Sequence, residues 1–173
     1  EKTDTLVVGA GQAGIAMSEH LSAHGIAHVV LERDRIAERW RTSRWDSLVA
    51  NGPAWHDRFP NRDYDDPDHD AFLPKEAVAD YFVDYVGQIN APVRCGVEVE
   101  QVTRRRAGGG FDVKTTGGDF EVQHIVAATG AFQDPVTPAL VPPADGLMQI
   151  HSNAYRNPAQ LPKGAVMVVG AGS

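Results

Sequence analysis

The stretch "LVVGAGQAGIAMSEHLSAHGIAHVVLERD", residues 6–34, decides the fold. An apolar run over 5–9 ends in glycine, which predicts a short buried strand of a parallel sheet. Residues 12–24 predict a helix, because apolar side chains recur there every four positions. The recurring side chains are Ala13, Met17 and Leu21. A second apolar run over 27–32 predicts another strand, so the stretch forms a βαβ unit with a right-handed crossover.

Three glycines in this stretch follow the spacing Gly-x-Gly-x-x-Gly, directly after the first strand and at the start of the helix. Gly9 permits a tight turn, Gly11 lets a pyrophosphate approach the backbone, and Gly14 lets the helix and strand pack closely. Free N–H groups and the helix dipole would then face the phosphates. We therefore expect a dinucleotide-binding turn made of Gly9, Ala10, Gly11, Gln12, Ala13 and Gly14.

Glu32 closes the second strand, where a carboxylate can accept hydrogen bonds from a ribose diol. The same carboxylate would repel a 2′-phosphate, so this first site favours FAD or NAD over NADP; the neighbouring Arg33 belongs to the expected binding set. Glycines alone are weak evidence, and the rival interpretation is a turn with only a packing role. The strand, helix, second strand and acid, all in their places, favour the nucleotide.

Residues 40–74 contain all three tryptophans, several prolines and many aspartates, without any period. We expect a long irregular excursion there; such loops are usually functional or disordered, and the aromatic content favours order. Residues 74–89 then predict a helix with one apolar stripe. The stripe consists of Val78, Tyr81, Phe82, Tyr85, Val86 and Ile89.

The remaining segments predict strands. Residues 91–102 predict one strand and 110–122 predict a hairpin closed by Gly117-Gly118, so that the two form a three-stranded meander. The segment "HIVAATG", 124–130, predicts a further buried strand. The segment "AVMVVGAGS", 165–173, predicts the start of another strand and glycine turn.

The expected fold is therefore α/β: a Rossmann-like FAD/NAD(P)-binding fold with a parallel sheet and a three-stranded antiparallel meander. We expect an FAD-binding domain over 1–145, a linker over 146–163, and over 164–173 the truncated start of a second, NAD(P)H-binding Rossmann domain. The chain lacks an initial Met and stops inside the second glycine motif, so further residues are expected beyond both ends.

Composition excludes several classes of protein. The net charge of −7 argues against a nucleic-acid partner, which would need clustered Lys and Arg. Cys95 is the only cysteine, which excludes an internal disulfide and a thiolate zinc site and fits a reducing, cytoplasmic setting. His20 and His24 have no evident third partner, so no metal site is expected. No apolar run reaches the about 18 residues of a membrane span, and no signal peptide is visible.

Four stretches resemble segments of one enzyme class. They are "VVGAGQAG" (7–14) with Glu32, "ERW" (38–40), "WDSLVANGPAWHDRFP" (45–60) and "HIVAATGAFQDPVTP" (124–138). Together they resemble the N-terminal part of the flavin-dependent monooxygenases, the class that includes the flavin-containing and Baeyer–Villiger enzymes. The disulfide-reductase branch shares this scaffold but needs a cysteine pair soon after the second strand, and the sequence has none.

The resemblance implies FAD as the first cofactor. The glycine turn and Glu32 would hold the ADP half of FAD, and Arg39 and Trp40 would meet its flavin side. Ala37-Glu38 stand where this class usually has two glycines.

Three further positions follow from the resemblance. Asn51 would line the reactive edge of the flavin as the catalytic residue; its rival role is that of a turn residue before Gly52-Pro53. Thr129 and Gly130 would lie beside the FAD pyrophosphate, and Val99 would offer backbone groups to the adenine.

The stretch "QIHSNAYRNP", 149–158, resembles the His-Ser-x-x-Tyr linker that precedes an NADPH domain in this class. Leu147 stands where that linker usually has glycine. His151 would either cap the linker or help to place the following domain, in which Gly170 and Gly172 would be the first glycines of an NADPH site.

The resemblance implies that the full enzyme is an NADPH-dependent monooxygenase, which oxygenates a small organic substrate with O2 through a flavin C4a-(hydro)peroxide. Its partners would be that substrate, O2 and the remainder of its own polypeptide, with a homo-oligomer possible. Two alternatives stay open: a flavin reductase or dehydrogenase without oxygen transfer, and a truncated nucleotide-binding fragment that has no activity of its own.

Overall fold

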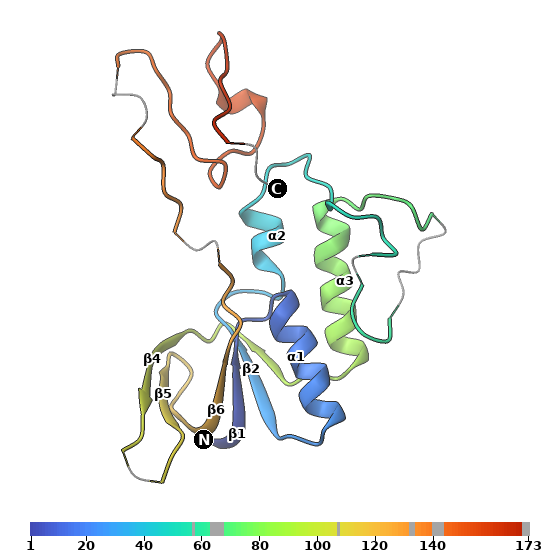
Figure 1. Cartoon of the computed structure of the whole chain (residues 1–173), viewed down its shortest axis with the longest axis vertical. Coiled ribbons are helices and arrows are strands. Elements are labelled where there is room, and N and C mark those ends of the chain that lie inside the picture. The colour runs from blue at the N-terminus through green and yellow to red at the C-terminus, as the bar shows by residue number, and fades with distance from the viewer. Residues whose placement is uncertain (57, 63–67, 107, 132–133, 140–143, 171–173) are drawn as a thin grey trace.

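The computed structural model describes residues 1–173 except 57, 63–67, 107, 132–133, 140–143 and 171–173 (Figure 1). Its core is a single six-stranded sheet with strand order β3-β2-β1-β6-β5-β4. The strands are β1 (Lys2–Val8), β2 (His28–Glu32), β3 (Val93–Cys95), β4 (Val99–Arg104), β5 (Phe111–Thr115) and β6 (Phe120–Ala127). The helices are α1 (Gln12–Ala23), α2 (Glu38–Thr42), α3 (Lys75–Gln88) and a 3-10 helix, Pro158–Gln160.

The parallel half of the sheet is centred on β1. This strand pairs in parallel with β2 on one side and with β6 on the other, and β2 in turn pairs in parallel with β3. The βαβ unit predicted from residues 6–34 is therefore confirmed. Because parallel strands present their carboxyl ends at the same edge, the glycine turn after β1 and the end of β2 lie together.

Alternate residues of β1 face opposite sides of the sheet, as strand geometry requires. Val7 belongs to the core between the sheet and helices α1 and α3, which lie on the same side of it (Figure 1). Leu6 belongs to a second core on the opposite face, formed with residues of β5 and β6. Burial on both faces explains why "TLVV" reads as a continuous apolar run.

The last strand of the predicted hairpin and the strand predicted at 124–130 form one continuous strand. Residues of the predicted hairpin (110–122) and of the predicted strand at 124–130 form the single strand β6, which pairs antiparallel with β5 along one edge and parallel with β1 along the other. The expected separation was wrong because no Gly or Pro interrupts the chain between Val122 and His124. The antiparallel meander is therefore continuous with the parallel sheet.

The single strand expected over 91–102 is instead two. β3 joins the parallel edge next to β2, and β4 forms the opposite edge of the sheet beside β5. Gly96 lies between them with φ +72, a left-handed conformation that ends an extended run. The backbone N–H of Val97 then donates to the Glu32 carbonyl at 3.0 Å, which brings the crossover past the end of β2.

The excursion over 40–74 is irregular, as expected, apart from the last residues of α2, a helix that the sequence pattern did not predict. An isolated bridge between Val49 and Pro74 closes it next to α3. Phe59 anchors the middle of this excursion: the residue is 4% exposed, and its ring stacks on Tyr85 with centroids 4.4 Å apart. The aromatic content therefore orders the described part of this excursion by packing it against α3.

The strand expected over 165–173 is absent from the described residues of that stretch. Val166, Met167, Val168 and Val169 are between 61% and 82% exposed, and no strand of the sheet lies beside them. A strand exists only where its backbone is paired, and the apolar run alone supplies no partner. Of the two glycines predicted there, Gly170 is described and Gly172 lies outside the described residues. None of the described helices is long and apolar enough to cross a membrane.

Candidate nucleotide-binding site

The three glycines after β1 meet different surroundings. Gly9 has φ +106, and a Cβ there would lie 2.6 Å from the carbonyl oxygen of Ala128. A Cβ on Gly14 would lie 1.9 Å from the carbonyl oxygen of Gly9. A Cβ on Gly11 would meet nothing within 4 Å. The close packing predicted at Gly14 is therefore present, and the space predicted beside the Gly11 backbone is open.

The open space lies at the start of α1. Gly11 is the N-cap residue, in an extended conformation, and no side chain caps the helix. The first N–H groups of a helix have no partner within it, and Gln12 and Ala13, which carry two of them, are exposed. An uncapped helix start beside a residue without a side chain is suited to a phosphate or pyrophosphate.

Glu32 is held across the mouth of this turn. Its Oε2 accepts a hydrogen bond from the backbone N–H of Ala10 at 2.8 Å, and its Oε1 accepts one from the N–H of Asp34 at 3.0 Å. Two N–H donors fix the carboxylate but leave lone pairs on both oxygens. The group can therefore still accept hydrogen bonds from a ribose diol. Arg33, next in sequence, is exposed and pairs with Asp34 at 3.3 Å.

The Ala-Thr-Gly segment after β6 lies against the glycine turn. The N–H of Ala128 donates to the Val8 carbonyl at 2.9 Å, and the carbonyl oxygen of Ala128 is the atom that a Cβ on Gly9 would meet first. Thr129 is exposed and Gly130 adopts φ +81. The structure thus brings together two segments, near residues 9 and 129, that the sequence could only associate by resemblance.

Helix α2 begins from the same turn. The N–H of Ala37 donates to the Ala10 carbonyl at 3.3 Å, and Ala37 itself has φ +58 and ψ +25, the left-handed conformation. Glycine is the residue best suited to this conformation, which accounts for the glycine usual at this position in the class that the sequence resembles. Trp40 then packs edge-on against Phe82 with centroids 6.4 Å apart, so α2 is anchored to α3.

A cavity of about 280 Å³ opens beyond α2. Residues from three separate segments line it, including Arg39, Arg44, Trp45, Asp134 and His151. The guanidinium of Arg44 lies 5.9 Å from the centroid of the Trp40 ring. Burial, together with the nearby Arg39 guanidinium, lowers the pKa of Arg44.

Arg44 and Trp45 were missed as site residues. No spacing signal in the sequence identifies them, because the turn that follows α2 folds them back toward the residues after β6 and the linker. The cavity joins Arg39, a predicted binding residue, to His151, for which the sequence left two roles open.

Asn51 is exposed in a bend just after the Val49–Pro74 bridge. Its neighbour Ala50 donates its N–H to the Leu73 carbonyl at 2.8 Å, which holds the bend in place. This geometry suits the turn role, and the catalytic role stays a prediction.

Val99 opens β4 opposite Thr115 and is partly buried. Two residues earlier, Val97 bonds to the Glu32 carbonyl. The start of β4 is therefore on the Glu32 side of the site, and the contact of Val99 with adenine stays a prediction.

Comparisons with known proteins identify the family of the chain. Residues 6–173 match the family model described as "Pyridine nucleotide-disulphide oxidoreductase". A protein named "Uncharacterized oxidoreductase CzcO-like" from Geobacillus kaustophilus is 36% identical over 98% of this chain and 48% of its own length. Indole-3-pyruvate monooxygenase YUCCA1 of Oryza sativa subsp. japonica is 28% identical over 97% of this chain and 42% of its own.

Solved structures share the fold. A mutant of a flavin monooxygenase from Stenotrophomonas maltophilia superimposes with a TM-score of 0.75 at 25% identity, over 92% of this chain and 48% of the other. The bacillithiol disulfide reductase Bdr of Bacillus cereus superimposes with a TM-score of 0.71 at 21% identity, over 82% of this chain and 44% of the other, and shows the fold alone. The chain spans about half the length of the curated relatives named above.

The open glycine turn and the ordered carboxylate fit the FAD and NAD(P)H binding that the matched family implies. Because the family model matches residues 6–173, the chain belongs to the pyridine nucleotide-disulphide oxidoreductase family.

Proposed function

We propose that this chain is the FAD-binding half of an NADPH-dependent monooxygenase that oxygenates a small organic substrate. The observation that carries the proposal is the juxtaposition of the open Gly11 backbone, the uncapped start of α1 and the Glu32 carboxylate. The names of relatives such as the rice indole-3-pyruvate monooxygenase and the S. maltophilia flavin monooxygenase favour oxygen chemistry over other flavin reactions.

The residues of this chain bind and orient. The backbone of Gly11 and the N–H groups at the start of α1 receive the pyrophosphate, and Glu32 accepts hydrogen bonds from the ribose. Thr129 and Gly130 flank the pyrophosphate from the β6 side, and backbone groups of Val99 meet the adenine. FAD, when bound, supplies the redox and oxygen chemistry; the protein supplies position, electrostatics and exclusion of water.

The flavin side of the proposed site is formed by α2 and the turn after it. Arg39 and Trp40 meet the flavin, and the Arg44 guanidinium over the Trp40 ring closes that side against solvent. Asn51 is proposed as an N–H donor at the reactive edge of the flavin.

Residues 164–173 are proposed as the start of a second, NAD(P)H-binding Rossmann domain, after an FAD domain over 1–145 and a linker over 146–163. Gly170, the first glycine of the second "VVGAG" motif, has φ +107, and Gly9, its counterpart in the first motif, has φ +106. The matching φ of these two glycines supports this assignment. The proposal includes a cytoplasmic enzyme whose remaining partners are O2, the rest of its own polypeptide and, where it assembles, copies of itself.

The test is NADPH oxidation by the purified full-length protein, with O2 uptake and peroxide measured together, because this 173-residue chain is expected to be inactive by itself. The monooxygenase should bind FAD, turn yellow and consume one O2 per NADPH with little peroxide in the presence of substrate. NADPH oxidation without oxygen incorporation would instead favour a flavin reductase. A colourless protein that cannot be reconstituted with FAD would overturn both.

A further inference from the structure

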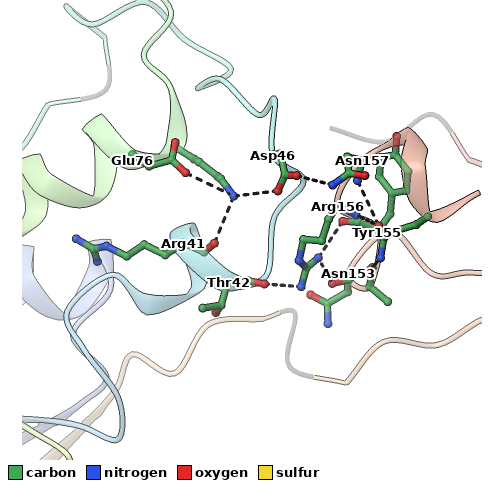
Figure 2. Close-up of polar contacts among 11 residues, drawn as sticks. Arg41, Thr42, Asp46, Glu76, Asn153, Tyr155, Arg156 and Asn157 are labelled. Atoms are coloured by element: carbon green, nitrogen blue, oxygen red, sulfur yellow. Dashed lines mark hydrogen bonds and ion pairs between the residues drawn. The ribbon is translucent and has the colours of Figure 1, made fainter.

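The linker folds back onto the segment that follows α2. The N–H of Asp46 donates to the Arg156 carbonyl at 2.8 Å, and Nδ2 of Asn157 donates to a carboxylate oxygen of Asp46 at 2.7 Å (Figure 2). These residues are more than a hundred positions apart in sequence. Backbone and side-chain hydrogen bonds of Asp46 therefore tie the linker to the segment that follows α2.

The Arg156 side chain extends this contact. Its Nη1 donates to the carbonyls of Asn153 and Tyr155, each at 2.8 Å, and its Nη2 donates to the carbonyl of Thr42 (Figure 2). One guanidinium thus binds the linker backbone with one nitrogen and the last residue of α2 with the other. Its planar fork of donors suits this bridging position better than a single ammonium group.

A second cation meets the same helix end. Nζ of Lys75, at the start of α3, donates to the Arg41 carbonyl at 3.3 Å and lies 3.9 Å from the Asp46 carboxylate. The Lys75 side chain is only 7% exposed. The carbonyls of the last helical turn have no partners within the helix and favour nearby cations. Lys75 and Arg156 therefore complete the C-terminus of α2 from two different segments.

Helix α2 depends on such contacts because it is five residues long, and a helix of this length has no stability in isolation. It carries Arg39 and Trp40. The cavity beside it is walled on the other side by the linker residues His151, Ser152 and Asn153. The bond from Arg156 to the Asn153 carbonyl holds that wall.

We propose that Arg156 is a positioning residue that couples docking of the linker to the placement of α2, and so to the flavin side of the site. The inference rests on the proposed function only in taking α2 to contact the flavin. The coupling between the linker and α2 is a property of this chain by itself. When the linker undocks, the Thr42 carbonyl at the end of α2 loses its hydrogen bond from Arg156. The cavity beside Arg39 loses its linker wall at the same time.

The first experiment measures the coupling without any cofactor. Arg156→Met and Arg156→Lys are compared with Arg94→Met, which removes an exposed ion pair with Glu1 outside α2 and the linker. Hydrogen exchange of residues 38–46 and the rate of tryptic cleavage after Arg39, Arg41 and Arg44 report the opening of α2. We expect both rates to rise about tenfold in Arg156→Met, partly in Arg156→Lys, and not in Arg94→Met.

A charge exchange supplies an independent variant. Asn157→Asp places a carboxylate against Asp46 and should undock the linker by repulsion, although Arg156 is intact. Adding Asp46→Asn restores one donor and one acceptor, and should return exchange of residues 38–46 to its original rate. Failure of this rescue, or unchanged exchange in Arg156→Met, would overturn the coupling.

The flavin readout connects the coupling to the site. In the FAD-loaded protein, Arg156→Met should change the visible circular dichroism of the flavin and weaken FAD binding about tenfold, and Arg156→Lys should recover part of both. If the unaltered protein binds no FAD, the proposed function fails, and the cofactor-free exchange experiment still decides the coupling. An unchanged flavin spectrum with faster exchange at α2 would refute the link to the site.

Discussion

The α carbon of Gly14 lies so close to the carbonyl oxygen of Gly9 that a Cβ at position 14 would be 1.9 Å from that oxygen. No side-chain rotation relieves such a contact, because the backbone fixes the position of the Cβ and the oxygen itself belongs to the backbone. At Gly11, three residues before Gly14, a Cβ meets nothing within 4 Å. The two glycines of one motif therefore differ in role: Gly14 is required by the fold, and Gly11 leaves open the space in which the pyrophosphate is proposed to bind.

Gly14→Ala should destabilise the protein by about 3 kcal/mol, because the helix must move away from β1 to admit a methyl group. Gly11→Val should cost at most about 1 kcal/mol, because valine is a poor N-cap residue but meets no clash in the extended backbone at this position. The same substitution should abolish FAD binding. Urea unfolding and flavin absorbance measure the two effects. Equal losses of stability, or FAD retained in Gly11→Val, would contradict the assignment.

Replacing Glu32 should affect both the turn and the ligand. Glu32→Ala removes the acceptor for the Ala10 and Asp34 N–H groups and should cost about 1–2 kcal/mol of stability. Glu32→Gln keeps an acceptor oxygen and should cost less. Both should weaken FAD binding, which titration with flavin fluorescence would show. An ion pair at the start of β1, the end opposite the glycine turn, offers a control: Lys2→Met, which removes the exposed pair with Glu121, should leave FAD affinity unchanged.

The left-handed conformation of Ala37 makes a sharp test of the α2 start. Ala37→Gly should leave stability nearly unchanged, because relief of backbone strain offsets the loss of a buried methyl group. Ala37→Val should cost about 2 kcal/mol or more, since a β-branched residue is poorly accommodated at positive φ. Thermal unfolding distinguishes the two. A stable Ala37→Val protein would show that the backbone at this position is not left-handed.

Tyr85 should make the stability of the folded chain depend on pH in alkaline solution. Its ring is fully buried, and its hydroxyl donates to the Glu19 carboxylate and to the Pro60 carbonyl at 2.7 Å. Burial first, and then the hydrogen bond to Glu19 and the Glu19 charge, raise the pKa of Tyr85 above its ordinary value of 10.0. The folded state therefore holds the proton more tightly than the unfolded state, so this contribution is intact below pH 10 and is lost as pH rises above it.

Urea unfolding between pH 9 and pH 11 would measure this loss. The unaltered protein should lose stability above about pH 10, more steeply than Tyr85→Phe, which has no proton to release there. At pH 7 Tyr85→Phe should be about 1–2 kcal/mol less stable, because it leaves Glu19 and the Pro60 carbonyl without that donor. Parallel pH profiles for the two proteins would show that Tyr85 does not titrate differently on folding.

The unit from β1 to β2 could be predicted because its signals are local. The apolar runs, the glycine spacing and Glu32 all lie within 34 residues, and each local preference agrees with the final fold. The helix over 74–89 was predictable for the same reason. The meander was recognised, but its last strand was divided, because period and composition do not show that one strand has different partners along its two edges.

The sequence by itself determined the nucleotide-binding unit, since backbone conformation and burial there follow from neighbouring residues. Only the tertiary structure decided the rest of the site. Helix α2 is too short to leave a periodic signal, and Lys75 and Arg156, from two distant segments, bind its last carbonyls. Arg44, Trp45 and His151 share a cavity only because the linker returns across more than a hundred residues. Contacts at such separations are set by packing and hydrogen bonds between segments, which no local pattern encodes.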